Sequence, residues 1–486
     1  EIMIYAAPPS QWLMWWAVLA TVFHTIGILS ALHAVLKCRT SEGAIAWGLS
    51  LLFFPYLALP AYWAFGKDKF TGYVQRFKRH QQARRNEWLE QVREAGPRAK
   101  PLSPDLDQAR VGFEHLADFP LTHGNRVDLL IDGEQAYQEM FQAIGQAKSY
   151  VLAEYFIIQN DGVGNQFREA LMERARAGVK VYLVYDEFGC LGVGRAFFEE
   201  MREAGVEVVA FAPGGWTKGR LQINFRNHRK ILVVDGQLAH VGGINIGDDA
   251  LGLNKFYGLW RDTNVSLTGP AVQGVQAVFC RDYYWASGGK SIPEIDWVPN
   301  PDHDGPDSAV YVAAGPADQT DTGTGVFLNS IYTARRRIWL ATPYFLPTAP
   351  VLSALQTAVL RGVEVKIIIP FKRDILLAYL AAFVYLPEAL RCGIEIHRFK
   401  AGYTHQKVML IDDELSWVGS SNMDARSMDL NFEGNLVVFG ARFASTVERM
   451  LKLDLERCER MKAEDCPKGL FFRFAVRFAR LFENIL

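Results

Sequence analysis

The same spaced triad of residues occurs twice in this 486-residue chain. The two copies are His228, Lys230 and Asp235 in NHRKILVVD, and His405, Lys407 and Asp412 in THQKVMLID. Each copy is followed at the same distance by Gly-x-x-Asn, which ends at Asn245 in the first copy and at Asn422 in the second. Reactive residues repeated with one spacing predict two similar halves that together build a single active site.

The repeat extends into the strands and helices expected around the motifs. Apolar stretches at 149–156 and 337–345 both end in Tyr-Phe, and each is followed by a helical pattern that ends at a glycine. A second buried strand is then expected in each half, over 179–185 and 363–369. Alternating strands and helices predict α/β lobes with a parallel or mixed sheet.

These patterns divide the chain into five expected segments. They are a membrane anchor (1–70), a basic linker (71–110), a first lobe (111–300), a second lobe (301–465) and an amphipathic basic helix (466–486). A stretch rich in Pro, Asp, Gly and Thr between 299 and 325 marks the join of the lobes. The predicted fold class is α/β, with two lobes that share one active site and follow an N-terminal transmembrane helical hairpin.

The spacing of each motif determines where its side chains point. Residues two apart on an extended strand face the same side, so each histidine faces the same way as its lysine. Asp235 and Asp412 lie five residues beyond the lysines, at the expected strand ends. We expect both aspartates to anchor the following turns and not to carry protons.

Two imidazoles, two ammonium groups and two amides in one pocket predict an anionic ligand. The amides come from Asn245 and Asn422, and a phosphate would neutralise the clustered cations. No carboxylate cluster suggests a metal, no cofactor is expected, and the lysines would take the place of a metal ion. One histidine can attack phosphorus while the other protonates the leaving oxygen, and the residues alone leave open which does which.

Each catalytic histidine needs an acceptor that orients its second ring nitrogen. Asp262 and Glu433 follow the histidines of their own halves at similar distances. We therefore expect Asp262 to orient His228 and Glu433 to orient His405. Ser420 supplies a hydroxyl near the expected phosphate in the second half, where the first half has Gly243.

The N-terminal region carries two stretches without a charged residue, Trp12–Val35 and Ala44–Phe65. About 20 apolar residues cross a bilayer core, so both predict transmembrane helices. A signal peptide is disfavoured because the first eleven residues contain no basic residue. A buried core helix is disfavoured by the length of each stretch. Pro55 and Pro60 leave open a re-entrant second segment.

Basic residues after the second stretch predict the orientation of the anchor. They are Lys67, Lys69, Arg76, Lys78, Arg79, Arg84 and Arg85. The positive-inside rule then places the remaining chain in the cytoplasm, at an inner cell membrane that the hairpin crosses twice.

Near the C-terminus, Arg473, Arg477 and Arg480 oppose a face rich in Phe, which predicts a helix lying in the membrane interface. Docking of that helix on the protein's own core is the alternative.

Composition narrows the set of partners. With 52 basic and 53 acidic residues the net charge is -1, so no global field attracts nucleic acid. The six cysteines show no zinc-binding spacing and are expected to be free thiols in a reducing compartment. The sequence leaves the oligomeric state open, and an oligomer is possible.

These motifs resemble the phospholipase D superfamily and, more narrowly, its bacterial cardiolipin synthases. The resemblance rests on NHRKILVVDG with GGINIGDD, HQKVMLIDD with GSSNMDARSMDLNFE, WRDTNVSLTGPAV, ATPYFLP and AAGP, and it covers almost the whole chain. It implies two phospholipase D-like lobes and a catalytic set drawn from the two triads. It further implies a phosphohistidine on His228, with His405 as the acid and base.

The resemblance also implies a reaction and its lipids. Two phosphatidylglycerol molecules in an anionic membrane would give cardiolipin and glycerol, without nucleic acid as a partner. A hydrolytic phospholipase D, or a synthase that uses phosphatidylethanolamine as co-substrate, stays open as an alternative. A nuclease and an inactive membrane scaffold are disfavoured by the membrane segments and by the two intact motifs. The apolar stretch Ile375–Leu386 is expected either to shield the site or guide acyl chains, or to pack in the core.

Overall fold

The structure is a computed structural model, and it describes residues 9–38, 41–66, 102–211, 224–289, 293–297 and 304–483. The chain separates into two compact units, residues 1–70 with 213–225, and residues 71–212 with 226–486. The basic residues between Lys67 and Arg85, and most of the predicted linker, lie outside the described residues.

The N-terminal unit contains three apolar helices, α1 (Pro9–Lys37), α2 (Ser41–Phe53) and α3 (Pro55–Phe65). Within the described residues, α1 is the helix that is long and apolar enough to cross a membrane, over Trp12–Lys37. The second predicted span is broken at Phe54, because Pro55 begins a new helix and its ring does not fit the interior of the preceding one. The second apolar stretch thus consists of the two helices α2 and α3. Pro60, by contrast, is accommodated inside α3.

The first lobe is a seven-stranded mixed sheet in the order β2-β10-β8-β7-β3-β4-β5. Its strands are β2 (Arg126–Ile131), β3 (Tyr150–Tyr155), β4 (Lys180–Asp186), β5 (Glu207–Phe211), β7 (Lys230–Val234), β8 (Leu238–Gly242) and β10 (Thr263–Thr268). Its helices are α6 (Asp132–Gln146), α7 (Gly162–Arg176), α8 (Arg195–Glu203) and α9 (Val272–Ala286). Strands β3, β4 and β5 are parallel, and the other neighbours are antiparallel.

The second lobe repeats this order as β11-β20-β18-β17-β12-β14-β15 within a larger sheet. These strands are β11 (Gly305–Ala314), β12 (Arg337–Ala341), β14 (Glu364–Pro370), β15 (Glu395–Phe399), β17 (Val408–Ile411), β18 (Leu415–Gly419) and β20 (Asn431–Phe439). Its helices include α10 (Thr322–Thr333), α11 (Ala349–Leu360), α12 (Leu376–Ala382), α13 (Leu386–Cys392), α14 (Ala425–Asp429), α15 (Ala441–Glu456) and α16 (Leu470–Arg480). Since parallel and antiparallel pairs also correspond, the predicted duplicated α/β fold is confirmed.

The boundary of the first lobe differs from the prediction. Helix α5 (Pro104–Ala117) packs against β11 and α10, and strand β1 (Thr122–Gly124) pairs with β11. Both elements therefore belong to the second lobe, and the first lobe begins at β2 and not at residue 111. The apolar side chains of α5, such as Phe113, are buried in the core of the second lobe. The position of α5 in the sequence, before the first lobe, does not indicate this packing.

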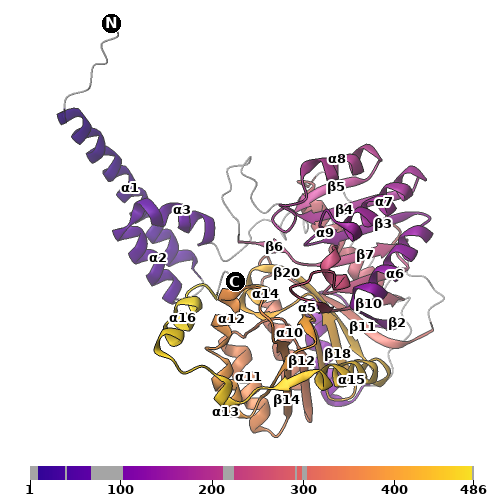
Figure 1. The fold of residues 1–486 in the computed structure, drawn as a ribbon. Helices are drawn as coiled ribbons and strands as arrows, with labels where there is room; N and C mark the ends of the chain where they lie inside the picture. Colours follow the sequence, from indigo (N-terminus) through magenta and orange to yellow (C-terminus); the bar gives the residue numbers. More distant parts are fainter. Residues whose placement is uncertain are drawn as a thin grey trace. The chain divides into compact units, whose positions relative to one another are not determined.

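Two short parallel strand pairs join the lobes. Strand β6 (Arg226–Asn227) of the first lobe pairs with β20 of the second. Strand β16 (Gly402–Thr404) of the second lobe pairs with β9 (Leu259–Arg261) of the first. Figure 1 shows β6 beside β20 at the line where the magenta and orange lobes meet. Each histidine motif begins directly after one of these bridging strands.

Candidate active site

His228 is positioned by the second lobe. Its backbone N–H continues the β6–β20 pairing by donating to the Phe432 carbonyl at 2.9 Å. Its ring Nδ1 lies 2.9 Å from Oε2 of Glu433, the next residue on β20. Because a carboxylate only accepts, Nδ1 donates and Nε2 is the nitrogen left for chemistry. Glu433 is itself fixed by the Ser420 hydroxyl and by the Asn431 amide.

His405 is positioned in the same way by the first lobe. Its backbone N–H donates to the Arg261 carbonyl at 2.8 Å, which continues the β9–β16 pairing. Its Nδ1 lies 2.7 Å from Oδ2 of Asp262, the residue after Arg261. The Thr263 N–H donates to the other carboxylate oxygen at 2.8 Å. Asp262 is fully buried, so the pair is held away from water.

The predicted pairing of histidines with carboxylates is therefore wrong, and the pairs are exchanged between lobes. Glu433 orients His228, and Asp262 orients His405. The reason is the register of the bridging strands, which sets each histidine beside the carboxylate of the other lobe. Residue spacing within one half could not predict this exchange, because His228 and Glu433 are 205 residues apart and His405 and Asp262 are 143 residues apart.

The two motif lysines lie beside the histidines in one buried cluster. Lys230 Nζ donates to the His228 carbonyl at 2.7 Å, and Lys407 Nζ donates to the His405 carbonyl. Burial lowers the pKa of Lys230 to about 7 and that of Lys407 to about 8, although Glu433 and Asp262 oppose this. A bound anion would reverse that loss of charge, so the site is suited to a phosphate.

Burial favours the neutral form of both histidines. Burial lowers the pKa of His228 to about 4, against the opposing effect of Glu433. Burial also lowers the pKa of His405, and the neighbouring Lys407 adds to this effect. Lys407 lowers the pKa of His228, and Lys230 lowers that of His405, so each lysine acts across the lobe boundary. The four groups thus form one electrostatic cluster.

Asp235 and Asp412 anchor the turns that end the motif strands, as expected from the sequence. The Asp235 carboxylate accepts from the backbone N–H groups of residues 148, 149 and 150 at 2.7 to 2.9 Å. The Asp412 carboxylate accepts from those of residues 335, 336 and 337 over a similar range, 2.8 to 2.9 Å. Both residues adopt a positive φ, which Asp tolerates better than most residues.

The remaining predicted support residues have different surroundings. The Ser420 hydroxyl donates to Glu433, so it belongs to the orienting network of His228. At the matching position a Cβ on Gly243 would lie 2.3 Å from Asp262 Oδ1, which explains the glycine. The Asn245 side-chain oxygen accepts from the Ile157 N–H at 3.3 Å. The buried Asn422 side-chain oxygen has no hydrogen-bond partner among the described residues.

Comparisons with known proteins agree with this geometry. The family model described as "Cardiolipin synthase, PLD-like domain" matches residues 140–282 and 327–455, and "Phospholipase_D-nuclease N-terminal" matches residues 26–67. Cardiolipin synthase A of Pseudomonas putida (strain W619) is 40% identical over 470 residues, which cover 95% of this chain and 97% of that protein. The chain belongs to the phospholipase D-like cardiolipin synthase family.

A second relative and one solved structure also match most of this chain. Cardiolipin synthase A of Pseudomonas entomophila (strain L48) is 39% identical across 96% of this chain and 97% of that protein. The crystal structure of phosphatidylserine synthase from Haemophilus influenzae Rd KW20 superposes with a TM-score of 0.59 at 13% identity, covering 78% of this chain and 100% of that one. This structure shares the fold. Membership of the family makes the chain a phosphatidyltransferase that is associated with membranes and acts on phospholipids.

Sequence reasoning missed the residues that fix the motif strands of this family member. Arg229, between His228 and Lys230, is fully buried, donates to the Glu433 carbonyl at 2.9 Å and pairs with Asp282 of α9. In the second half, Gln406 takes this position and its amide donates to Asp454 of α15 at 3.1 Å. The Asp on α9 of the first lobe and the Asp on α15 of the second lobe were the available sequence signal.

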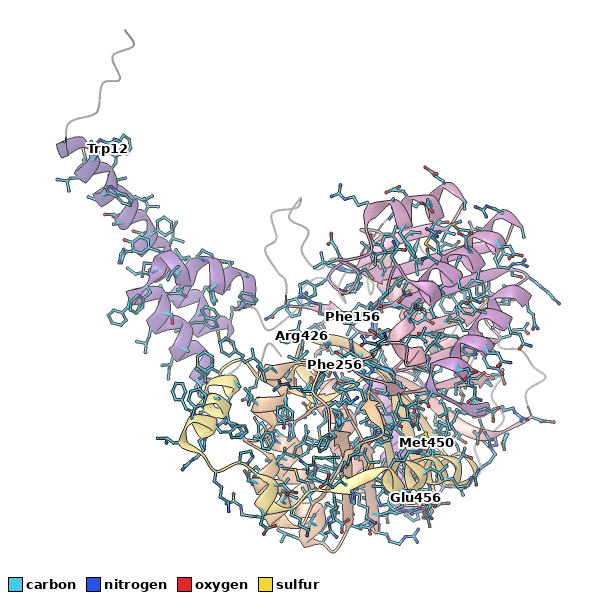
Figure 2. All side chains as sticks on the ribbon, in the orientation of Figure 1. Trp12, Phe156, Phe256, Arg426, Met450 and Glu456 are labelled. Carbon is cyan, nitrogen blue, oxygen red and sulfur yellow. The ribbon has the colours of Figure 1, made fainter. Side chains whose placement is uncertain are left out.

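Aromatic rings also line the two histidines. The Phe156 ring, labelled in Figure 2, lies 4.8 Å from the His228 ring. The Trp260 ring lies 5.2 Å from the His405 ring. Both aromatic residues come from the first lobe, where Phe156 directly follows β3 and Trp260 lies on β9. These rings keep the surroundings of the histidines apolar, which strengthens the charge effects described above.

Proposed function

We propose that this chain is a cardiolipin synthase that transfers a phosphatidyl group from one phosphatidylglycerol to another, giving cardiolipin and glycerol. The observation that carries the proposal is the exchanged histidine–carboxylate pairing around two buried lysines. In this arrangement each histidine donates through Nδ1 to a carboxylate, which leaves Nε2 for the reaction. The two lysines supply the positive charge that binds one phosphate. Relatives named cardiolipin synthase A support the choice of reaction.

In the first step the neutral His228 attacks phosphorus through Nε2. A P–N bond forms, the P–O bond to glycerol breaks, and the glycerol oxygen takes a proton from His405. The phosphate raises the pKa of His405 on binding, because an anion favours the imidazolium. Lys230 and Lys407 stabilise the negative oxygens. We assign the nucleophile to His228, the histidine of the first half, as the family resemblance implies, and burial favours its neutral form.

In the second step a hydroxyl of another phosphatidylglycerol replaces the departed glycerol. His405 takes the proton of that hydroxyl, the new P–O bond forms, and the P–N bond to His228 breaks. Water would give hydrolysis instead, so transfer requires a site that limits water. Burial of both histidines and the adjacent rings of Phe156 and Trp260 support transfer.

The membrane arrangement follows from the apolar helices. We place α1 across the inner cell membrane of a bacterium, α2 and α3 within the same membrane, and the lobes in the cytoplasm. Helix α16 exposes Phe471, Phe474 and Phe478 while it packs against α12 through another face. That exposed face would enter an anionic membrane interface, with its arginines at the headgroups. Slower hydrogen exchange of residues 470–480 on phosphatidylglycerol vesicles than in detergent would test this.

Product analysis of the purified full chain in phosphatidylglycerol vesicles tests the proposed reaction. We expect cardiolipin and glycerol in equal amounts, and a loss of at least about 1,000-fold in His228→Ala and His405→Ala. Phosphatidic acid as the main product would indicate a hydrolytic phospholipase D. A faster reaction when phosphatidylethanolamine is added would indicate that lipid as co-substrate.

A further inference from the structure

A pocket in the second lobe, the lobe that carries His405, is not used by the proposed mechanism. Its cavity volume is about 120 Å³, and it opens to solvent. The loop that follows β14, residues 371–374, forms one wall, and Tyr379 on α12 and Phe383 directly after α12 form another. The apolar stretch 375–386 is thus part of a pocket wall and not only of the core.

The polar groups of this pocket gather at one place. The Tyr344 hydroxyl donates to the Asp374 carboxylate, and both residues line the pocket. Tyr403 is fully buried, does not line the pocket, and lies next to both residues. Asp374 and Tyr344 are close enough to Tyr403 to raise its pKa, after the larger effect of burial. The pocket therefore presents a phenol and a carboxylate side by side, with a second phenol against them.

This polar cluster borders the proposed catalytic groups. Tyr403 is two residues before His405, and their ring centroids are 6.3 Å apart. The Trp260 ring lies between 4.9 and 5.2 Å from both rings. Asp374 is among the carboxylates that raise the pKa of Lys407 against burial. A molecule held by the cluster would therefore lie beside His405, where the glycerol leaves and the second hydroxyl enters.

The chemistry of the cluster favours a neutral polyol. Phenol hydroxyls donate and accept, and a carboxylate accepts, which matches the adjacent hydroxyls of a glycerol headgroup. A positively charged headgroup would meet the pocket residues Lys372, Arg373 and Arg398. Lys372 is held in place by the carbonyls of Phe256 and Tyr257 at 3.0 Å. Three cations against one carboxylate disfavour an ammonium group.

We propose that Tyr344 and Asp374, supported by Tyr403 behind them, bind the free hydroxyls of the glycerol headgroup, first of the donor lipid and then of the acceptor. This rests on the proposed function and extends it, because it makes these three residues the determinants of headgroup choice. The headgroup is thereby held with its reacting oxygen toward His405 in both steps. Water, which offers one oxygen only, gains less from the same contacts.

The test compares two donor lipids in wild type and in Asp374→Asn, Tyr344→Phe and Tyr403→Phe. One donor is phosphatidylglycerol, and the other is phosphatidylpropanol, whose headgroup lacks the two free hydroxyls. Both donors are mixed in the same detergent micelles, so that phosphatidylglycerol is the acceptor in both cases, and the readout is the ratio of kcat/KM for release of the two alcohols. We expect wild type to prefer phosphatidylglycerol, and Asp374→Asn to reduce that preference by about 10-fold or more. Asp107→Asn, a matched change on the exposed face of α5, keeps the wild-type ratio.

The possible results separate this inference from the proposed function. Absence of cardiolipin from the wild-type reaction would overturn the proposed function itself. If wild type makes cardiolipin but the variants lose activity equally on both donors, the hydroxyl-binding role is overturned and the residues only support the fold. Equal use of both donors by wild type overturns it as well. Phosphatidylethanolamine as the preferred donor, with that preference lost in Asp374→Asn, would assign an ammonium site instead.

Discussion

At the residue scale, the site depends on carboxylates that hold each histidine through Nδ1. Glu433 and Asp262 are fully buried, and each has a second donor besides its histidine. Their pKa values are lowered by the facing histidines and lysines in spite of burial. Both therefore stay ionised and fix the tautomer of the ring. The exchange of partners between lobes makes a specific prediction.

Replacement of one carboxylate should disturb the histidine of the other half. We expect Glu433→Gln to change the ¹⁵N NMR signals of the His228 ring, and Asp262→Asn to change those of His405. Each variant should also lose roughly 10²–10⁴-fold in kcat, because the tautomer is no longer fixed. Signals assigned through the alanine variants provide the control. A response of His405 alone to Glu433→Gln would contradict the exchanged pairing.

His240 on β8 provides a prediction for stability against pH. It is buried without a hydrogen-bond partner among the described residues, and burial lowers its pKa to about 4. The unfolded chain binds a proton below about pH 6.5 and the folded chain only below about 4, so stability falls as the pH drops through this window. His240→Leu should remove roughly 2 kcal/mol of the stability difference between pH 8 and pH 5.

Thermal unfolding in detergent at the two pH values measures this effect. The exposed His115, replaced by Leu, is the matched control for the exchange of a histidine for a leucine. If the difference in stability between the two pH values is unchanged in His240→Leu, other groups cause the loss of stability in acid.

At the element scale, short strands and one helix determine how the lobes are built. The bridging pairs β6–β20 and β9–β16 deliver the histidines to their partners. Helix α5 and strand β1 precede the first lobe in sequence and yet complete the second. The second lobe therefore contains segments that precede the first lobe in sequence as well as segments that follow it. Substitutions in α5 should for this reason lower the stability of the second lobe.

Phe113→Ala in α5 should weaken the second lobe selectively. Phe113 is fully buried, and its ring lies 6.1 Å from that of Phe439 on β20. We expect a loss of about 3–5 kcal/mol. Hydrogen exchange should become faster in 305–314 and 431–439 than in 150–155. Phe167→Ala, in the first-lobe core, is the matched control with the reverse pattern. Faster exchange of the first lobe in Phe113→Ala would contradict the revised boundary.

At the scale of the whole molecule, one chain supplies both halves of the site. Two histidines, two lysines and two carboxylates come from lobes that are joined in one compact unit. The site is complete without residues from a second copy. Oligomers are thus not required for the proposed reaction.

Mixing two inactive variants should accordingly restore no activity. His228→Ala and His405→Ala, combined in the same vesicles, should stay at the level of each alone, because each chain lacks one half of its own site. Cardiolipin formation on a phosphatidylglycerol substrate is the measurement. Recovery toward a quarter of wild-type activity would show that lobes exchange between chains.

The sequence by itself determined the duplicated α/β lobes, the two histidine–lysine pairs and the turn-anchoring role of Asp235 and Asp412. All of these depend on spacing within one strand and its turn, which local geometry governs. The apolar anchor was equally visible, although Pro55 divides its second part. Tertiary structure alone decided that Glu433 serves His228 and Asp262 serves His405. Those contacts depend on strand pairing between lobes across 205 and 143 residues, and no spacing within one half encodes such a pairing.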